Sequence, residues 1–297
     1  NGSPDEKIIA FFGRVNYTLD DVIFINASLR REGSTKLGAD NQWGLFPSAG
    51  LGVDLNNYLN LGVDKFKVRL GYGITGALPG PNGLSRQIRG FTYASATGGG
   101  SSSPLRDANP DLKWEEKAET NLGLEYRNGK LDATIDVYTR DISDFILNRQ
   151  VDQAIYPTGY RYENAGKLNT KGVEVALNYQ LTDNYNTGLI LSSYKTMLEE
   201  YVNNAEMRAN LGAPGQNSTA VIRVKVGEEI GTIWGPIHEG VAGGNNVFAD
   251  VNGDGTINVG QDQALNEDVD FAVLGNGTPD LELGWTNQLT FGSWSVN

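Results

Sequence analysis

The chain has 297 residues and a formal net charge of −12. It contains no cysteine and a single histidine, His238, which excludes disulfide frameworks, thiolate metal sites and multi-histidine metal centres. The acidic balance also excludes nucleic acid as an expected partner, because DNA and RNA are bound by clustered basic side chains. No apolar run is long enough for a membrane helix, but a membrane β-barrel is not excluded, since its apolar residues occupy alternate positions only.

Alternating apolar and polar residues predict nine strands and the start of a tenth. The alternation is unbroken over residues 65–75, where the apolar residues from Phe66 to Ile74 share one face. The predicted strands lie at approximately 9–19, 22–31, 45–55, 65–75, 115–126, 130–140, 173–181, 186–197 and 281–291, and the tenth begins after 292–293.

Strand length and loop length then indicate the fold class. Strands of about 11 residues tilted by ~40° span roughly 27 Å, close to the hydrocarbon thickness of a bilayer. Short connections at 20–21, 56–64, 127–129, 182–184 and 292–293 alternate with long ones at about 32–44, 76–114, 143–168 and 198–279. All short turns therefore fall at one end of the strands. This pattern predicts an all-β, transmembrane antiparallel β-barrel with short periplasmic turns and long extracellular loops.

Several stretches of the sequence carry a family resemblance. Residues 109–115, Asn-Pro-Asp-Leu-Lys-Trp-Glu, resemble the start of a late barrel strand in TonB-dependent outer-membrane transporters of the SusC/RagA type. Further stretches at 13–17, 28–34, 46–48, 68–76, 164–166 with 169–174, and 250–255 match the same family in the same order. The resemblance covers nearly the whole chain, but only the C-terminal part of the family's barrel.

The resemblance implies that residues 1–297 are a partial barrel domain of about ten strands from a 22-stranded barrel, without the plug domain and the remaining strands. It implies residence in the outer membrane of a Gram-negative bacterium, surrounded by outer-membrane lipid. It also implies active import of oligosaccharides or peptides, driven by the TonB complex acting on a plug region, with a SusD-like lipoprotein as partner at the surface. We expect no enzymatic activity and no catalytic residues.

Residues 250–258 match the first nine positions of an EF-hand-type calcium loop. The five candidate ligands are Asp250, Asn252, Asp254, Thr256 (through its carbonyl) and Asp262. Position 12 of the motif is Gln261 instead of an acid, and Asp262 follows one residue late. Two interpretations remain open: a structural Ca²⁺ ion that stabilises the long loop, or an Asp-, Asn- and Gly-rich turn without an ion.

Three tyrosines in the 143–168 loop, Tyr156, Tyr160 and Tyr162, are candidates for stacking on a sugar or peptide ligand. They could equally pack the loop against its neighbours. The G-x-G-x-x-G stretch at 71–76 is no nucleotide site, because Pro79 and Pro81 prevent the helix that such a site needs. Gly71 and Gly73 are instead expected to face the barrel lumen.

An alternative from another class is a soluble or surface-exposed β-rich carbohydrate-binding or adhesin module with a calcium-stabilised loop. The two functions differ in the apolar strand face, which a soluble sandwich buries and a membrane barrel presents to lipid.

Overall fold

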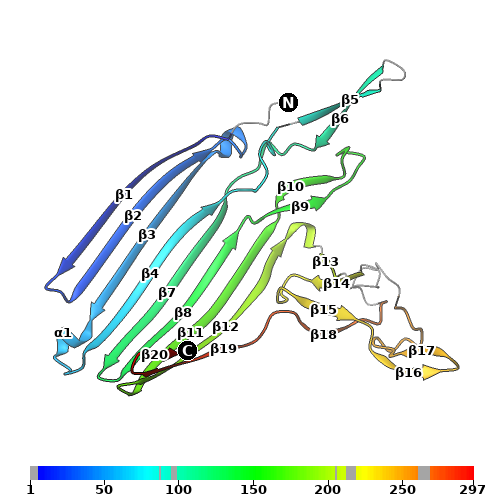
Figure 1. The fold of residues 1–297 in the computed structure, drawn as a ribbon. Helices are drawn as coiled ribbons and strands as arrows, with labels where there is room; N and C mark the ends of the chain where they lie inside the picture. The colour runs from blue at the N-terminus through cyan, green and yellow to red at the C-terminus, as the bar shows by residue number, and fades with distance from the viewer. Residues whose placement is uncertain (1–5, 87, 95–98, 205, 212–218, 260–267) are drawn as a thin grey trace.

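A computed structural model describes residues 6–86, 88–94, 99–204, 206–211, 219–259 and 268–297. Ten strands form the main sheet: β1 (Ile8–Leu19), β2 (Ile23–Ser34), β3 (Trp43–Asp54), β4 (Lys65–Ala77), β7 (Glu115–Asn128), β8 (Leu131–Ser143), β11 (Gly166–Thr182), β12 (Tyr185–Tyr201), β19 (Glu282–Phe291) and β20 (Trp294–Val296). They pair antiparallel in this order, so each strand lies beside its neighbour along the chain (Figure 1). The sheet is open, with β1 at one edge and β20 at the other.

The nine predicted strands and the short tenth are confirmed. The largest difference lies in β11, which begins at Gly166 and not at Val173. Backbone pairing with β8 and β12 continues through residues 167–171, where Leu168 is the only apolar side chain. In β11 the alternation of apolar and polar side chains therefore covers a shorter stretch than the backbone hydrogen bonding does.

The register of the sheet brings apolar residues into one unbroken row on a single face. The row crosses nine strands and consists of Leu19, Ile23, Val53, Val68, Leu124, Ile135, Val175, Leu191 and Leu283. This face is uncovered: Leu122 is 52% exposed and Leu283 is 63% exposed. An apolar face of this extent needs lipid as its solvent.

The adjacent row, which points to the opposite face, is polar. It consists of Thr18, Phe24, Gly52, Arg69, Gly123, Asp136, Glu174, Ser192 and Glu282. Lipid-facing and lumen-facing residues alternate along every strand in this way when a sheet is a segment of a transmembrane barrel wall. We refer below to the apolar face and the polar face of the sheet.

The two ends of the sheet differ as the loop lengths predict. The turn end carries tight turns and one short helix, α1 (Leu55–Leu59), and the opposite end carries the long loops (Figure 1). The long loops contain strands that the sequence did not predict: β5 (Ile88–Ala94), β6 (Gly99–Arg106), β9 (Ile146–Gln150), β10 (Tyr160–Asn164), β13 (Met207–Leu211), β14 (Thr219–Val224), β15 (Thr232–Gly235), β16 (His238–Ala242), β17 (Asn245–Phe248) and β18 (Ala272–Asn276). All ten have four to eight residues, too few for a clear period. The predicted loop at 32–44 shrinks to residues 35–42.

Buried apolar side chains gather where loops cover the loop end of the sheet. One cluster contains Leu37, Phe46, Leu84, Leu112 and Trp114. The other contains Phe145, Ala165, Leu198 and Val224. These two clusters anchor the 78–114 and 144–165 loops and so position the surface described next.

Within the described part of the chain, no helix has the length and apolar character needed to cross a membrane.

Candidate functional site

A hollow of about 670 Å³ lies on the polar face over β2, β3, β4 and β7. Its floor is formed by four glycines, of which Gly50 and Gly71 are direct cross-strand partners. A Cβ atom on Gly71 would meet no heavy atom within 4 Å, so the missing side chain of Gly71 leaves open space, whereas one on Gly50 would lie 2.5 Å from the Asn26 side chain. As expected, Gly71 and Gly73 share the face that carries the charged residues.

Charged side chains surround the hollow and pair across strands. The Arg69 guanidinium lies 2.6 Å from the Glu125 carboxylate and 3.2 Å from that of Asp136. Arg140 lies 2.6 Å from Glu119 on the neighbouring strand. Lys67 projects over the ring of Phe24, with its Nζ 3.9 Å from the ring centroid. The hollow thus offers fixed hydrogen-bond donors and acceptors to a polar ligand.

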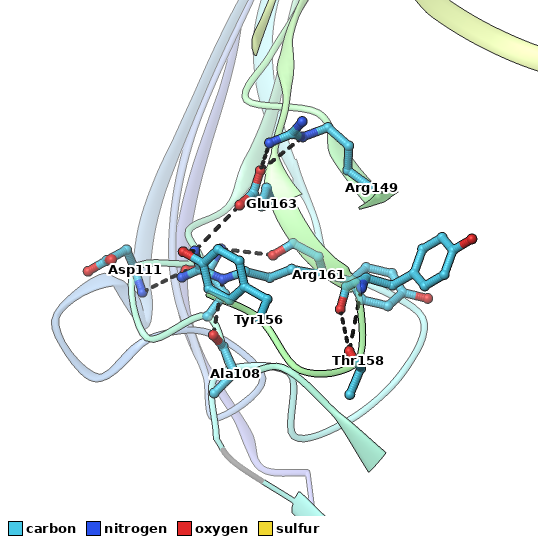
Figure 2. A network of polar contacts seen from close by, with 10 residues as sticks. Ala108, Asp111, Arg149, Tyr156, Thr158, Arg161 and Glu163 are labelled. Carbon is cyan, nitrogen blue, oxygen red and sulfur yellow. Dashed lines mark hydrogen bonds and ion pairs between the residues drawn. The ribbon is translucent and has the colours of Figure 1, made fainter. Parts of the chain in front are cut away.

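A second polar network joins two loops around Arg161 (Figure 2). The Arg161 guanidinium donates to the Tyr156 hydroxyl at 2.6 Å, to Oδ1 of Asn109 at 2.9 Å and to the Ala108 carbonyl at 3.0 Å. It also stacks over the Tyr156 ring, 4.8 Å from the centroid. Glu163 pairs with Arg161 and, at 2.8 Å, with Arg149. This network fixes the 144–165 loop against the 78–114 loop.

Residues 109–114, part of the stretch that carries the family resemblance, form the side of this contact that lies in the 78–114 loop. The Asn109 side-chain amide donates to the Tyr162 carbonyl at 2.8 Å, and its oxygen accepts from the Asp111 N–H at 3.1 Å. Leu112 is fully buried, and the indole N–H of Trp114 donates to the Gln42 carbonyl. Residues 109–114 therefore fasten three chain segments at the loop end of the sheet.

The three candidate tyrosines occupy different environments. Tyr156 is held by Arg161, and Tyr162 packs against the cluster that contains Leu112. Tyr160 is 53% exposed. Tyr160 thus offers the most free ring surface, whereas the other two take part in loop packing. Sequence reasoning missed Arg161 and Glu163, because a charged residue beside a tyrosine gives no periodic signal.

The calcium-type loop is closed by its own backbone. Asp250 accepts N–H groups from Gly253 at 2.7 Å and Gly255 at 2.8 Å, and Asp254 accepts the Thr256 N–H at 2.7 Å. Gly253 and Gly255 have φ of +77° and +81°, which favour glycine. These turns bring the candidate ligands into one short loop. Gln261 and Asp262 lie outside the described residues. Among the residues that are described, no group of three or more His, Cys, Asp or Glu side chains is arranged to hold a metal.

Asp270 holds this loop from outside the motif. Its carboxylate is completely buried and accepts N–H groups from Asn258 at 2.7 Å and Val251 at 2.8 Å. The N–H of Asn258, with those of Asn252 and Val251, lowers the pKa of Asp270 despite the cost of desolvation. No sequence pattern links Asp270 to the motif, so its role emerges only from the fold.

The chain is similar to known outer-membrane receptors along its length. TonB-dependent receptor P3 of Formosa agariphila is 25% identical over 99% of this chain, which covers 31% of the relative. TonB-dependent receptor SusC of Bacteroides thetaiotaomicron is 28% identical over 90% of this chain, which covers 29% of that relative. The chain therefore spans about a third of the length of these relatives.

Solved structures agree on the fold. The chain superposes on the structure of the RagAB peptide transporter with a TM-score of 0.78 and 18% identity, covering 96% of this chain and 31% of that one. A family model described as TonB dependent receptor-like, beta-barrel matches residues 1–297. The family consists of receptors and transporters of the Gram-negative outer membrane, and it is not an enzyme family. This chain belongs to the TonB-dependent receptor-like β-barrel family.

Proposed function

We propose that this chain forms part of the wall of an active importer for oligosaccharides or peptides. The observation that carries the proposal is the division of one sheet into an uncovered apolar face and a charged face with a glycine-floored hollow. A wall of this kind separates lipid from a polar lumen through which a hydrophilic solute can pass. Family membership favours this function over the soluble binding module.

The partners follow from the relatives. A receptor named SusC and the structure of the RagAB peptide transporter support a TonB-dependent mechanism with a SusD-like surface lipoprotein. The loop surface around Tyr160 is where a captured ligand would first meet this chain. An exposed tyrosine ring suits a sugar or a peptide, since it offers an apolar face and a hydroxyl.

Uptake by cells that carry the full-length protein tests the proposal. The probes are fluorescently labelled maltooligosaccharides and a labelled casein digest, each with and without an active TonB complex. We expect TonB-dependent uptake of one probe class. Gly71→Trp should reduce this uptake at least about tenfold, because the indole fills the hollow.

Gly13→Trp is the matched control. A Cβ atom on Gly13 would also meet no heavy atom within 4 Å, but the register places this residue on the apolar face, where an indole is compatible with lipid. Uptake of neither class, or equal uptake by the two variants, would contradict the proposed path through the hollow.

We also propose that the 250–258 loop binds Ca²⁺ as a structural ion, with Asp250, Asn252, Asp254, Thr256 and Asp262 as ligands. The clustered turns around Asp250 support this assignment. Millimolar Ca²⁺ is expected to slow proteolysis of this loop in the full-length protein, and Asp250→Asn should abolish the protection. Equal cleavage with Ca²⁺ and with a chelator would show that the loop is a turn without an ion.

A further inference from the structure

A polar row follows the apolar rows toward the loop end of the apolar face. Thr120, Thr139, Lys171 and Lys195 are successive cross-strand partners on β7, β8, β11 and β12. Lys171 lies four residues from Val175, about 10 Å closer to the loops at ~3.3 Å per residue and a ~40° tilt. A long lysine side chain at this height reaches the headgroup level of the outer leaflet.

These residues line a hollow of about 490 Å³ with two chemically different halves. Leu122, Val137 and Val173 form its apolar half, and all three are at least 38% exposed. The other half is formed by Thr120, Thr139, Ser193, Lys171 and Lys195. Such a lining matches an amphiphile with one apolar chain and one anionic, hydrogen-bonding headgroup.

The charge of the polar half is only partly balanced by the protein. Lys171 and Lys195 are directly opposite each other, an arrangement of like charges that destabilises a sheet unless an anion lies nearby. Lys195 pairs with two carboxylates, Glu229 at 3.5 Å and Asp280 at 3.6 Å, and the side chains of Lys195 and Asp280 are 60% and 88% exposed. Among the described residues, Lys171 forms no ion pair. Lys171 therefore has capacity for an external anion, and the exposed Lys195 lies beside it.

We propose that Lys171 and Lys195 bind a phosphate group of an outer-leaflet lipid, whose acyl chain lies against Leu122, Val137 and Val173. The occupant is a lipid because the hollow is continuous with the membrane-facing surface. The bound group is a phosphate because two adjacent ammonium groups and two hydroxyls match its charge and its acceptor oxygens. This contact would fix the height and rotation of the barrel in the outer leaflet.

The test measures lipid retained by the full-length protein after extraction in mild detergent, by native mass spectrometry. The probe for rebinding is lipopolysaccharide purified from the same membrane, before and after removal of its phosphates. Each lysine is worth about fivefold in binding, so Lys171→Gln with Lys195→Gln should lower retention about 25-fold. Removal of the phosphates should lower binding to the wild type to a similar extent.

Lys130→Gln is the control, because Lys130 lies in the turn between β7 and β8 at the opposite end of the sheet. Its retention should equal that of the wild type. Lys171→Arg with Lys195→Arg should keep binding and so separates lost charge from misfolding. Unchanged retention in the glutamine variant, or rebinding that does not depend on phosphate, would overturn the proposal. Neither result bears on solute uptake.

Discussion

Replacing Leu191 by lysine is expected to destabilise the folded barrel by about 2–4 kcal/mol, the cost of a cation at the lipid-facing midplane. Leu191 lies in the unbroken apolar row between Val175 and Leu283. A lysine here has hydrocarbon around it and no carboxylate among its direct cross-strand partners.

Ser192→Lys provides the matched control, one residue further along the same strand. Ser192 points to the polar face, and its cross-strand partners are Glu174 and Glu282. A lysine there gains two carboxylates, so we expect a change below about 1 kcal/mol. The measurement is urea-dependent unfolding of the full-length protein in lipid vesicles, followed by its heat-modifiable gel mobility. Equal destabilisation by the two substitutions would be incompatible with the assigned faces.

Arg161→Ala is expected to cost the loop end of the protein about 3 kcal/mol of local stability, through lost hydrogen bonds to a charged group and an unpaired glutamate. Arg161 is largely buried and links Tyr156, Asn109 and the Ala108 carbonyl. Its removal should release the 144–165 loop from the 78–114 loop while the sheet stays folded.

Hydrogen exchange of the full-length protein measures this release directly. Amides in residues 107–112 and 156–164 should exchange about 100-fold faster in the variant, and those of β8 and β11 should be unchanged. Arg89→Ala is the control, because the Arg89 guanidinium donates to Ser102 within the β5–β6 hairpin and the residue is exposed. If the amides of both loop segments still exchange as slowly in the Arg161 variant as in the wild type, the Arg161 network is not needed to hold the two loops together.

The sheet was predictable from sequence because its two faces meet different solvents. Successive residues such as Val68 and Arg69 face lipid and lumen in turn, so apolar and polar side chains alternate along the strand. This pattern can be recognised without knowing any tertiary contact. The loops were less predictable. β9 and β10 are held together by ion pairs such as that of Arg149 with Glu163. The spacing of apolar residues in the sequence carries no information about such contacts.

The candidate site also contains features that the sequence predicts and features that it does not. Gly71 and Gly73 were placed on the correct face by parity alone, but the hollow over them also needs Gly50 and Gly52 from a neighbouring strand. The 250–258 motif was visible as a sequence, whereas Asp270, which fastens it, lies beyond the motif. Register and long-range contacts therefore account for what sequence reasoning missed.

The division of the sheet into a lipid face and a lumen face is most directly tested by a single-cysteine scan of residues 171–181 in β11. This chain has no cysteine, so each introduced thiol is its only one. Spin labels in the full-length protein, freed of other cysteines and held in vesicles, would report collisions with oxygen, which favours lipid, and with a water-soluble nickel chelate. We predict strict alternation: oxygen access at 173, 175, 177 and 179, and nickel access at 172, 174, 176 and 178. Equal nickel access at both sets of positions would contradict the assignment of the two faces.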